Sequence, residues 1–421
     1  MEVVQEEIRP GYKMTKLGWF PEDWDISRLS ALGIWKGGGT PSKANSSFWD
    51  NGTIPWASSR DIKGVILKNT TYLITENAIK ESSANSIPAG NLLMVTRSGI
   101  LQHTFPIAKN LFDVAINQDI KALILNKKFE VDFIQGVLIH RNGHILKTCS
   151  KVGTTVESIE YSWLKDYQIP VPKLPEQKAI AQVLSTWDKA IENLTQLIAE
   201  KQQKKKALMQ QLLTGKKRFP GFDGEWKEVK LGDVFERIRE TGEDIDDKSE
   251  AYTISSKLGF VTQHQKFDRV IAGSSLKKYT LIRRDEFSYN KGNSKTFPYG
   301  CIFKFEQDHG LIPFVYISFR STGEVSIDFY KHYFFFGMLE RQLKKIITSG
   351  ARGDGLLNVN PDSFFKLMID LPPVEEQQKI AEVLNAATKE IELLNQKLDA
   401  LKDQKKGLMQ QLLTGKKRLK I

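Results

Sequence analysis

The hydrophobic pattern is clearest in two stretches, around residues 176–213 and 376–413, where apolar side chains recur at alternating steps of three and four. This pattern, with polar residues between, predicts a long coiled-coil helix in each stretch. Lysines fill the gaps in the pattern, Lys201 and Lys205 in the first stretch and Lys405 in the second. The positions expected to pair the helices are Ile180, Leu184, Trp187, Ile191, Leu194, Ile198, Leu208, Leu212, Ile380, Leu384, Ala387, Ile391, Leu394, Leu398, Leu401, Leu408 and Leu412.

The two stretches are copies of one another. The segment Leu208–Arg218 returns unchanged as Leu408–Arg418, and Glu176-Gln177 returns as Glu376-Gln377. A solenoid would repeat several times at about 20–50 residues, so a single duplication with this long period indicates two halves. Prolines before each copy and a glycine after it agree with helix starts and ends. Two copies in one frame favour antiparallel packing against each other over two unrelated surface helices.

The heptad positions also predict the register of the two helices. If the helices pair antiparallel along their full length, Lys405 lies opposite Trp187 and Lys205 lies opposite Ala387. We expect a cation–π contact between Lys405 and Trp187, and room over Ala387 for the aliphatic stem of Lys205. Trp187→Ala should then weaken the pairing more than Ala387→Leu, as thermal unfolding would measure.

Each long helix closes a half that opens with a tryptophan, Trp24 or Trp226. Between them, short apolar runs separated by turn residues predict strands with few helices. We therefore expect an α+β protein with a first domain at 1–175, a helix within 176–218, a second domain at 219–374 and a helix within 375–421. The expected strands are 54–57, 65–67, 92–95, 120–125, 252–254, 260–262, 279–282, 301–305 and 325–327, with helices at 131–139 and 330–347.

Composition narrows the class of protein. The chain has 421 residues and a net charge of +11, which favours a polyanionic partner such as nucleic acid. No apolar run approaches the ~18–20 residues of a membrane span, and the acidic start is unlike a signal peptide. Cys149 and Cys301 lack CxxC partners, so neither a zinc module nor a disulfide scaffold is expected. We expect a cytoplasmic protein.

The motifs that could indicate catalysis each lack an essential part. Gly215-Lys216-Lys217 lacks the spacing of a P-loop, and Asp370–Pro373 has an inserted leucine and no aromatic compared with an adenine methyltransferase motif. No glycine-rich loop follows a strand and opens a helix, as an S-adenosylmethionine site would need. His140 and His144 have the spacing of a zinc-binding pair, but no glutamate lies between them and Gly143 interrupts the helix that such a pair needs. Asp403-x-Lys405 could be the end of a nuclease motif, but it lies within the heptad pattern. We expect no catalytic and no metal site in this chain.

Binding residues remain, because polar and basic side chains gather near the turns of both domains. Arg and Lys reach phosphates, and Arg, Asn and Gln can pair with base edges. The alternative for any one of them is a solvated surface position. The candidates are Lys36, Thr40, Ser42, Lys43, Ser58, Ser59, Arg60, Arg97, Ser98, Asn117 and Gln118 in the first domain, and Ser255, Ser256, Lys257, Gln263, Gln265, Lys266, Lys277, Lys278, Tyr289, Asn290, Lys291, Asn293, Ser294, Lys295 and Arg352 in the second.

Several of these motifs together resemble one family, the DNA specificity (S) subunits of type I restriction–modification systems, over nearly the whole chain. The motifs are Gly38-Gly39-Thr40-Pro41, Ile54-Pro55-Trp56, Asp61, Asn117-Gln118-Asp119, the two Glu-Gln-x-x-Ile helix starts after Pro172 and Pro372, and the two Gln-Leu-Leu-Thr-Gly-Lys-Lys-Arg ends. The resemblance implies two mixed α/β target recognition domains, separated by a pair of long antiparallel coiled-coil helices in a pseudo-two-fold arrangement.

The resemblance also implies the function. Each recognition domain would read one half of an asymmetric, bipartite site in double-stranded DNA, while the helices set the spacing and dock two methyltransferase (M) subunits. S-adenosylmethionine, Mg and ATP would be used only in M and restriction (R) subunits, and whether an R subunit exists stays open. Two alternatives remain, a coiled-coil adaptor without base readout and a stand-alone DNA methyltransferase or nuclease.

Overall fold

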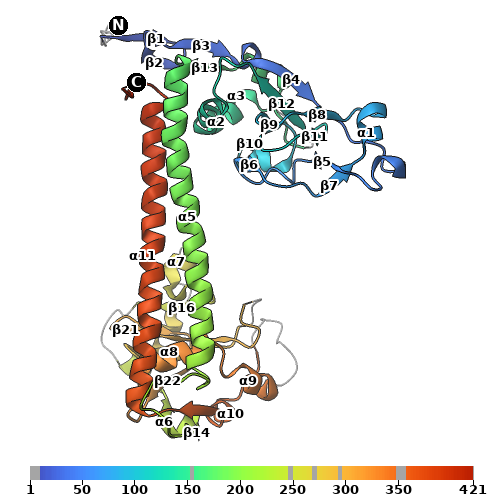
Figure 1. Ribbon diagram of the computed structural model, residues 1–421. Helices are drawn as coiled ribbons and strands as arrows, with labels where there is room; N and C mark the ends of the chain where they lie inside the picture. Colours follow the sequence, from blue (N-terminus) through green and yellow to red (C-terminus); the bar gives the residue numbers. More distant parts are fainter. Residues whose placement is uncertain are drawn as a thin grey trace. The chain divides into compact units, whose positions relative to one another are not determined.

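The computed structural model describes residues 10–151, 156–244, 250–267, 273–292, 296–347 and 357–420. It divides into two compact units, Met1–Thr195 with Lys397–Ile421, and Gln196–Gln396. Each unit holds one of the two diverged segments, the start of one long helix and the end of the other (Figure 1). No helix of the described residues is long and apolar enough to cross a membrane.

The two long helices are α5 (Leu174–Leu212) and α11 (Val374–Leu412). Both end where the repeated glycine allows a left-handed backbone, with φ of +65° at Gly215 and +69° at Gly415. In the first copy, the Gly215 amide donates to the Leu212 carbonyl and the Lys217 amide donates to the Gln211 carbonyl. These bonds satisfy carbonyls that the end of a helix leaves open. The predicted helices and their stop signals are confirmed.

The antiparallel packing of α5 and α11 is also confirmed, within each unit (Figure 1). In the first unit Ile180 and Leu184 share a core with Leu412. In the second unit Leu212 shares a core with Ile380 and Leu384. Every predicted pairing position is buried or half-buried. The ends of the helical seam are thus part of the domain cores as well as of the helix pair.

The register lies within one residue of the predicted one, but the predicted aromatic contact is wrong. In the first unit the Lys405 ammonium pairs with the carboxylate of Asp188, the residue after Trp187. No cation–π contact of Lys405 with Trp187 occurs among the described residues. A carboxylate is a stronger partner than an indole face at this partly exposed position. In the second unit Lys201 pairs with Glu390 at 2.5 Å.

Among its described residues, the first unit contains a five-stranded and a four-stranded sheet besides two-stranded pairs. One has the order β4-β12-β9-β10-β6 and the other β7-β5-β11-β8. Helix α2 (Val131–His140) packs between the first sheet and the long helices, and its Phe133 and Ile134 share a core with Ile180. The strands are β1 (Tyr12–Thr15), β2 (Gly18–Pro21), β3 (Asp25–Arg28), β4 (Gly33–Gly37), β5 (Ile54–Ala57), β6 (Ile66–Leu67), β7 (Tyr72–Ile74), β8 (Asn85–Ile87), β9 (Leu92–Val95), β10 (Ile107–Asn110), β11 (Val114–Ile116), β12 (Ile120–Leu125) and β13 (Gln168–Val171), and the other helices are α1 (Glu76–Glu81), α3 (Asn142–Cys149) and α4 (Tyr161–Asp166).

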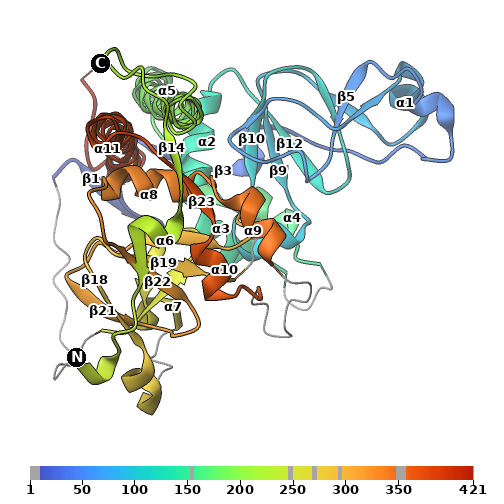
Figure 2. The same ribbon diagram turned by 90° about the horizontal axis from the view of Figure 1, so that it is seen from below.

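The second unit has one four-stranded sheet, β15-β22-β19-β20, and several two-stranded pairs. Helix α8 lies between this sheet and α11, and its Phe329 and Tyr330 share a core with Phe287 and Leu384 (Figure 2). The strands are β14 (Lys227–Lys230), β15 (Phe235–Arg237), β16 (Tyr252–Ser255), β17 (Gly259–Thr262), β18 (Thr280–Arg283), β19 (Phe287–Asn290), β20 (Cys301–Lys304), β21 (His309–Ile312), β22 (Ile317–Ser321) and β23 (Met368–Leu371), and the helices are α6 (Leu231–Val234), α7 (Gln263–Phe267), α8 (Ile327–Phe335), α9 (Glu340–Ile346) and α10 (Pro361–Phe365).

Most predicted strands are present with small shifts, and two predictions are corrected. The expected strand 325–327 is wrong, because the Ser326 side chain accepts from the Phe329 amide and caps the start of α8. The expected helix 330–347 is two helices, α8 and α9, separated at Gly337. Its φ of +85° is incompatible with a continuing helix.

The repeated ends close each unit in the same way. In the second unit the Arg218 guanidinium pairs with the buried Glu376 carboxylate through two nitrogens, and Trp226 Nε1 donates to Glu376 Oε2 at 2.9 Å. In the first unit Arg418 and Trp24 hold Glu176 in the same manner. The arginine at the end of one long helix thus binds the glutamate at the start of the other. This contact accounts for the repeated glutamate and the repeated arginine.

The repeated glutamines attach each long helix to its domain. Gln177 accepts from the Glu130 amide, just before α2, and donates to the Pro172 carbonyl. Gln377 accepts from the Ser326 amide, at the start of α8, and donates to the Pro372 carbonyl. Both side chains are almost fully buried. A buried amide with its hydrogen bonds satisfied fixes the orientation of the elements that it joins.

Candidate nucleic-acid interface

The glycine-rich loop after β4 is fixed by close backbone contacts. A Cβ on Gly38 would lie 1.8 Å from the Ile116 carbonyl oxygen, and a Cβ on Gly39 would lie 1.8 Å from Ser83 Oγ. Trp56 Nε1 donates to the Gly39 carbonyl at 3.1 Å, which joins the loop to β5. Only glycine permits this approach. The loop therefore presents the residues that follow it, including the exposed Ser42 and Lys43, from a rigid base.

Two predicted residues meet at the surface of this loop. Thr40 Oγ1 donates to Gln118 Oε1 at 2.8 Å, so residues distant in sequence form one polar surface. Asn117 does not contribute to it. It is 5% exposed, its Nδ2 donates to Asp119 Oδ2 and its Oδ1 accepts from the Asp119 amide. The prediction that Asn117 contacts DNA is wrong, because its polar atoms already form hydrogen bonds within the turn.

Asp61 organises the loop that carries Ser58, Ser59 and Arg60. Its Oδ2 accepts from the amide and hydroxyl of Ser58, and its Oδ1 accepts from the amide and hydroxyl of Thr71. Burial favours a higher pKa for Asp61, but the hydrogen bonds from Thr71 and Ser58 outweigh it and lower the pKa below 3.8. Asp61 is therefore a fixed anion that holds the loop rather than a contact to DNA.

A cleft of about 580 Å³ brings three predicted residues of the first unit together. Ser59, Arg60 and Ser98 line it, and Lys63 and Asn142 join them. Asn142 is tied to the backbone of Phe105, since its Nδ2 donates to the Phe105 carbonyl at 2.7 Å. The cleft thus has a rigid floor and a rim with two cations. Lys63 was missed from the sequence, because nothing in its local context distinguishes it from other surface lysines.

Four predicted cations of the first unit are free to meet phosphates. They are exposed and form no ion pair among the described residues, unlike Arg28, which pairs with Asp166. A cation without a carboxylate partner releases more favourable electrostatic energy on meeting a phosphate. The four are Lys36, Lys43, Arg60 and Arg97.

In the second unit several predicted residues lie in or beside the β16–β17 hairpin. Ser255 Oγ accepts from the Lys257 and Leu258 amides in the turn, and Asn290 Nδ2 donates to the Ile254 carbonyl. Ser256 directly follows β16, Lys291 directly follows β19, and both are half-buried. Gln265 caps the start of α7 by accepting from the Thr262 amide. The exposed cations, which form no ion pair among the described residues, are Lys257, Lys266, Lys277 and Lys278.

Two predicted residues of the second unit are corrected. Tyr289 is fully buried, its hydroxyl donates to the Tyr299 carbonyl, and its ring stacks on Phe364. Gln263 is 3% exposed and its Nε2 donates to the Tyr279 hydroxyl. Both residues belong to the core. The sequence places them near turns but does not show which side chains face inward. Four other candidates lie outside the described residues: Asn293, Ser294, Lys295 and Arg352.

An aromatic cluster beside Lys43 was not predicted from the sequence. The rings of Trp49, Trp56 and Tyr72 meet edge to face, with centroids 5.4 to 6.3 Å apart. They line a pocket of about 320 Å³ with Lys43 and Asp50. The cluster holds the Lys43 loop in place, since Trp49 Nε1 donates to the Ser42 carbonyl. Its members come from separate elements, so no local pattern could have shown it.

The described residues contain no group of three or more His, Cys, Asp or Glu that could hold a metal ion. The cations of the second unit that face carboxylates are structural, such as Arg320 with Glu236 and Glu240. What remains exposed in each unit is a set of unpaired cations beside hydroxyl and amide side chains on rigid loops. Such a surface suits contact with a phosphate backbone and base edges.

Comparisons with known proteins agree with this surface. A family model described as type I restriction modification DNA specificity domain matches residues 21–202 and again 223–403. The specificity subunit of the EcoR124I/EcoR124II type I restriction enzyme of Escherichia coli is 37% identical over 168 residues, which cover 40% of this chain and 42% of that protein. The MjaIX specificity subunit of Methanocaldococcus jannaschii is 26% identical over 97% of this chain and 96% of its own length.

Solved structures share the fold. The S subunit of a type I restriction–modification system from M. genitalium superposes with a TM-score of 0.56 at 16% identity, over 96% of this chain and 99% of that one. A chain from a structure of type I R-M complex assembly and conformational transition gives a TM-score of 0.58 at 15% identity, over 94% of this chain and 99% of that one.

Proposed function

Because this chain belongs to the family of type I restriction–modification specificity subunits, we propose that it is the non-catalytic subunit that reads DNA for such a complex. Each diverged domain reads one half of a bipartite site, and α5 and α11 set the spacing and dock two modification (M) subunits. The observation that carries the proposal is the double family match, in which each match spans one diverged domain and most of the long helix that follows it.

The physical features agree with two different reading surfaces. The first unit offers a cleft with Arg60 and Ser98 on a rim. The second offers the β16–β17 hairpin with Lys257 at its turn. Two unlike surfaces cannot read identical half-sites, so the target is not a palindrome. The net charge of +11 adds the sequence-independent attraction to phosphates.

Catalysis is assigned to partner subunits. The sequence has no glycine-rich loop between a strand and a helix that would cradle S-adenosylmethionine, and the Asp370–Pro373 segment forms strand β23 and the turn into α11. Methylation of adenine would belong to the M subunits. ATP-dependent and Mg-dependent steps would belong to R subunits where the system has them.

The test is selection of bound sequences from a random duplex pool, with the chain co-expressed with its M subunit and salt held constant. Salt must be constant because phosphate contacts dominate affinity. Two short, unlike motifs at one fixed spacing are expected. A single motif, a palindrome or no enrichment would contradict the proposal and favour a protein adaptor without base readout.

A pair of substitutions tests whether the exposed arginines of the first unit contact DNA. Arg60→Ala with Arg97→Ala should weaken binding of the selected site and lower the slope of log affinity against log salt by about 0.9 for each phosphate that the chain no longer touches. The matched control is Arg28→Ala in the same unit, since Arg28 already pairs with Asp166. Equal salt slopes for the double variant and the control would remove Arg60 and Arg97 from the interface.

A further inference from the structure

Lys405 and Lys205 occupy equivalent positions in the two copies of the long helix but have different surroundings. In the first unit Lys405 of α11 pairs with Asp188 of α5. The equivalent positions in the second unit are Lys205 and Thr388, so that the lysine is kept and the carboxylate is replaced by a hydroxyl. Thr388 Oγ1 donates to the Leu384 carbonyl of its own helix at 2.7 Å. The repeat therefore leaves Lys205 without the partner that Lys405 has.

Lys205 is an unmatched and partly desolvated cation. Its side chain is half-buried and forms no hydrogen bond or ion pair among the described residues. Burial lowers its pKa below 10.5, and the Lys331 cation lowers it further, while Glu392 acts in the opposite direction. Removing an ammonium from water without a counter-charge is unfavourable, so an anion placed beside it would be stabilised.

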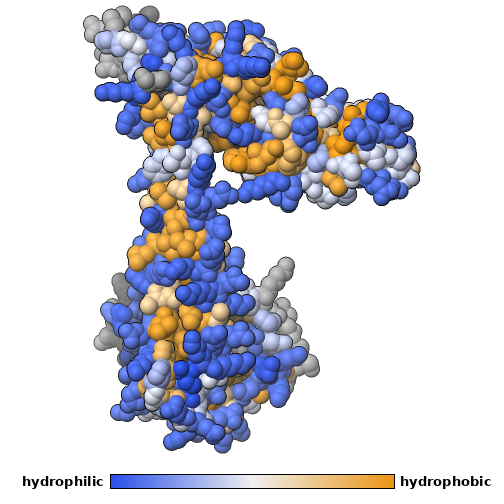
Figure 3. All heavy atoms as spheres, viewed as in Figure 1, coloured by the Kyte–Doolittle hydropathy of each residue, from blue (hydrophilic) through white to orange (hydrophobic). Residues whose placement is uncertain are grey.

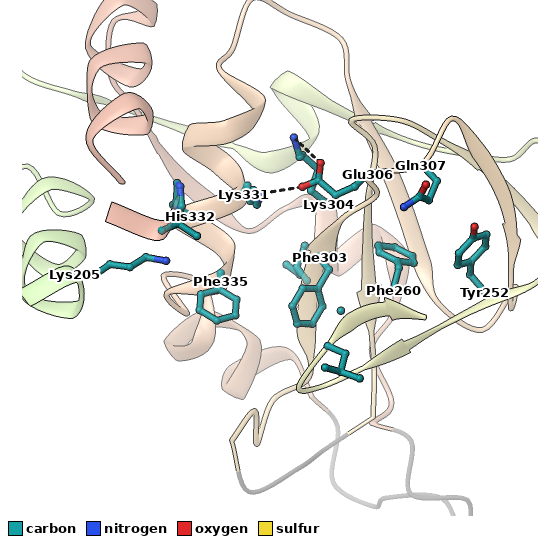
Figure 4. A pocket seen from close by; sticks show the side chains of 14 residues that line it. Lys205, Tyr252, Phe260, Phe303, Lys304, Glu306, Gln307, Lys331, His332 and Phe335 are labelled. Carbon is teal, nitrogen blue, oxygen red and sulfur yellow. Dashed lines mark hydrogen bonds and ion pairs between the residues drawn. The ribbon is translucent and has the colours of Figure 1, made fainter. Parts of the chain in front are cut away.

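Lys205 lies where two adjoining pockets meet. The first, of about 370 Å³, has the rings of Phe260, Phe303 and Phe335 in its wall, and Lys205 extends toward His332 and Phe335 (Figure 4). The second, of about 450 Å³, shares Lys205, Phe335 and Thr388 with the first. Its other lining residues are Gln202, Lys206, Met209, Phe336, Ile391 and Glu392. We call the two together the Lys205 pocket.

The other buried or half-buried charges of the Lys205 pocket are already matched. Lys331 binds Glu306 at 2.8 Å, as Figure 4 shows. Lys304 binds Asp328 at 2.9 Å and Asp285 at 3.0 Å. Lys205 therefore stands out as the one half-buried cation among the described lining residues that has no counter-charge in contact. The pocket places the rings of Phe303 and Phe335 beside this cation.

We propose that the Lys205 pocket receives an acidic side chain of one modification subunit, whose carboxylate takes the place that Asp188 has beside Lys405, with an apolar neighbour against Phe335. The proposal rests on the proposed function, since it takes M docking on α5 and α11 as given. Aromatic side chains around a desolvated charge are typical of the energetic centre of a protein interface. A DNA backbone would instead meet exposed, hydrated cations.

The surface around the pocket agrees with a protein partner. Figure 3 shows hydrophobic side chains along the long helices on the viewed face, interrupted by hydrophilic ones. In the second unit Phe335 is 48% exposed and Leu393 of α11 is 51% exposed. The first unit satisfies its lysine internally, so its M subunit docks without this ion pair. The two M subunits therefore bind with different affinities to one chain.

The experiment is a titration of the purified full-length chain with its M subunit, resolving one-to-one and two-to-one complexes by mass. Lys205→Glu should weaken one of the two binding steps by about tenfold or more, because it opposes the partner carboxylate, and should leave the other step unchanged. Lys205→Arg should retain binding. Lys204→Glu is the matched control, since Lys204 is the preceding, exposed residue of α5 and does not line the pocket.

Thr388→Asp tests the same site without removing the lysine. It rebuilds the Lys405–Asp188 pair in the second unit, so it should raise the melting temperature of the chain while weakening the same M-binding step as Lys205→Glu. A gain in stability together with a loss of partner affinity is a result that simple misfolding cannot give.

Three results would overturn the inference. If the wild-type chain binds two M subunits and neither Lys205→Glu nor Thr388→Asp alters this binding, the inference is refuted and the proposed function is left intact. Equal weakening by Lys204→Glu would show a general charge effect. Unaltered assembly with weaker DNA binding by Lys205→Glu would assign Lys205 to a phosphate. Failure of the wild-type chain to bind any M subunit would instead refute the proposed function.

Discussion

Glu176 and Glu376, at the repeated helix starts, are two of the three buried carboxylates among the described residues. Glu376 has no exposed side-chain surface, and Arg218, 22% exposed, is its ionic partner. Arg218 also lies over the Trp226 ring, 5.3 Å from its centroid. A buried carboxylate depends on its partner far more than an exposed one, because water cannot reach it to take the place of that partner.

We therefore expect Arg218→Met to lower the unfolding free energy of the chain by about 3–5 kcal/mol, as denaturant unfolding would measure. Lys217→Met, at the exposed neighbouring position, is the control and should have little effect. The double variant Arg218→Met with Glu376→Met should recover part of the loss, since it removes both charges. No recovery would mean that Arg218 acts through its packing on Trp226 instead.

The buried carboxyl group of Glu286 predicts how the stability of the chain changes with pH. Burial raises its pKa above 4.5, against the opposing effects of the Arg283 amide and the Arg320 and Arg283 cations. A raised folded pKa means that this group favours folding most below its unfolded pKa and that the benefit disappears as pH rises through the folded value. A glutamine in its place would resemble the protonated acid at every pH. Glu286→Gln should thus raise the melting temperature at pH 7, with the gain vanishing below about pH 4.5. A gain that persists at low pH would contradict this cause.

At the scale of elements, the long helices share their stop signal but differ in what surrounds it. Gly215 and Gly415 both have positive φ. A Cβ on Gly215 would make an ordinary 3.6 Å contact with the Trp226 ring, whereas a Cβ on Gly415 would lie 2.4 Å from Pro21 Cδ. Identical sequence therefore predicts identical backbone and leaves the surroundings undetermined.

Gly215→Ala should cost about 1–2 kcal/mol, the usual penalty for a left-handed residue with a Cβ. Gly415→Ala should cost clearly more, because Pro21 must also move. Unfolding of the two variants side by side measures the difference, and each serves as the other's control. Equal losses would show that Pro21, at the end of β2, moves at no cost.

At the scale of the whole molecule, the helices are proposed to act as a spacer. Deleting one heptad from each, residues 193–199 and 393–399, keeps the apolar ladder in phase and removes about 10.5 Å of helix. We expect the same two DNA motifs to be selected, at a spacing shorter by up to about three base pairs of ~3.4 Å, with weaker binding of the original site. Deletion from α5 alone should disrupt pairing. Unchanged spacing would contradict the spacer role.

The sequence by itself determined the elements whose signals are local or repeated. The heptad ladder, the glycine stops and the antiparallel pairing all follow from side-chain period and from duplication, because one face of a long amphipathic helix must be covered. The family motifs likewise identified positions such as Asp61 and Gly39. Local signals failed where one residue changes the outcome, as Ser326 does by capping α8 and Gly337 by ending it.

Only the tertiary structure decided which side chains face solvent and which charges meet. Asn117, Gln263 and Tyr289 sit near turns in the sequence, yet their polar atoms are used inside the fold. Lys205 and Lys405 occupy equivalent places in the ladder, yet of these two only Lys405 contacts a carboxylate among the described residues. Burial and pairing depend on what the rest of the chain brings to a residue, and that is set by long-range packing rather than by local pattern.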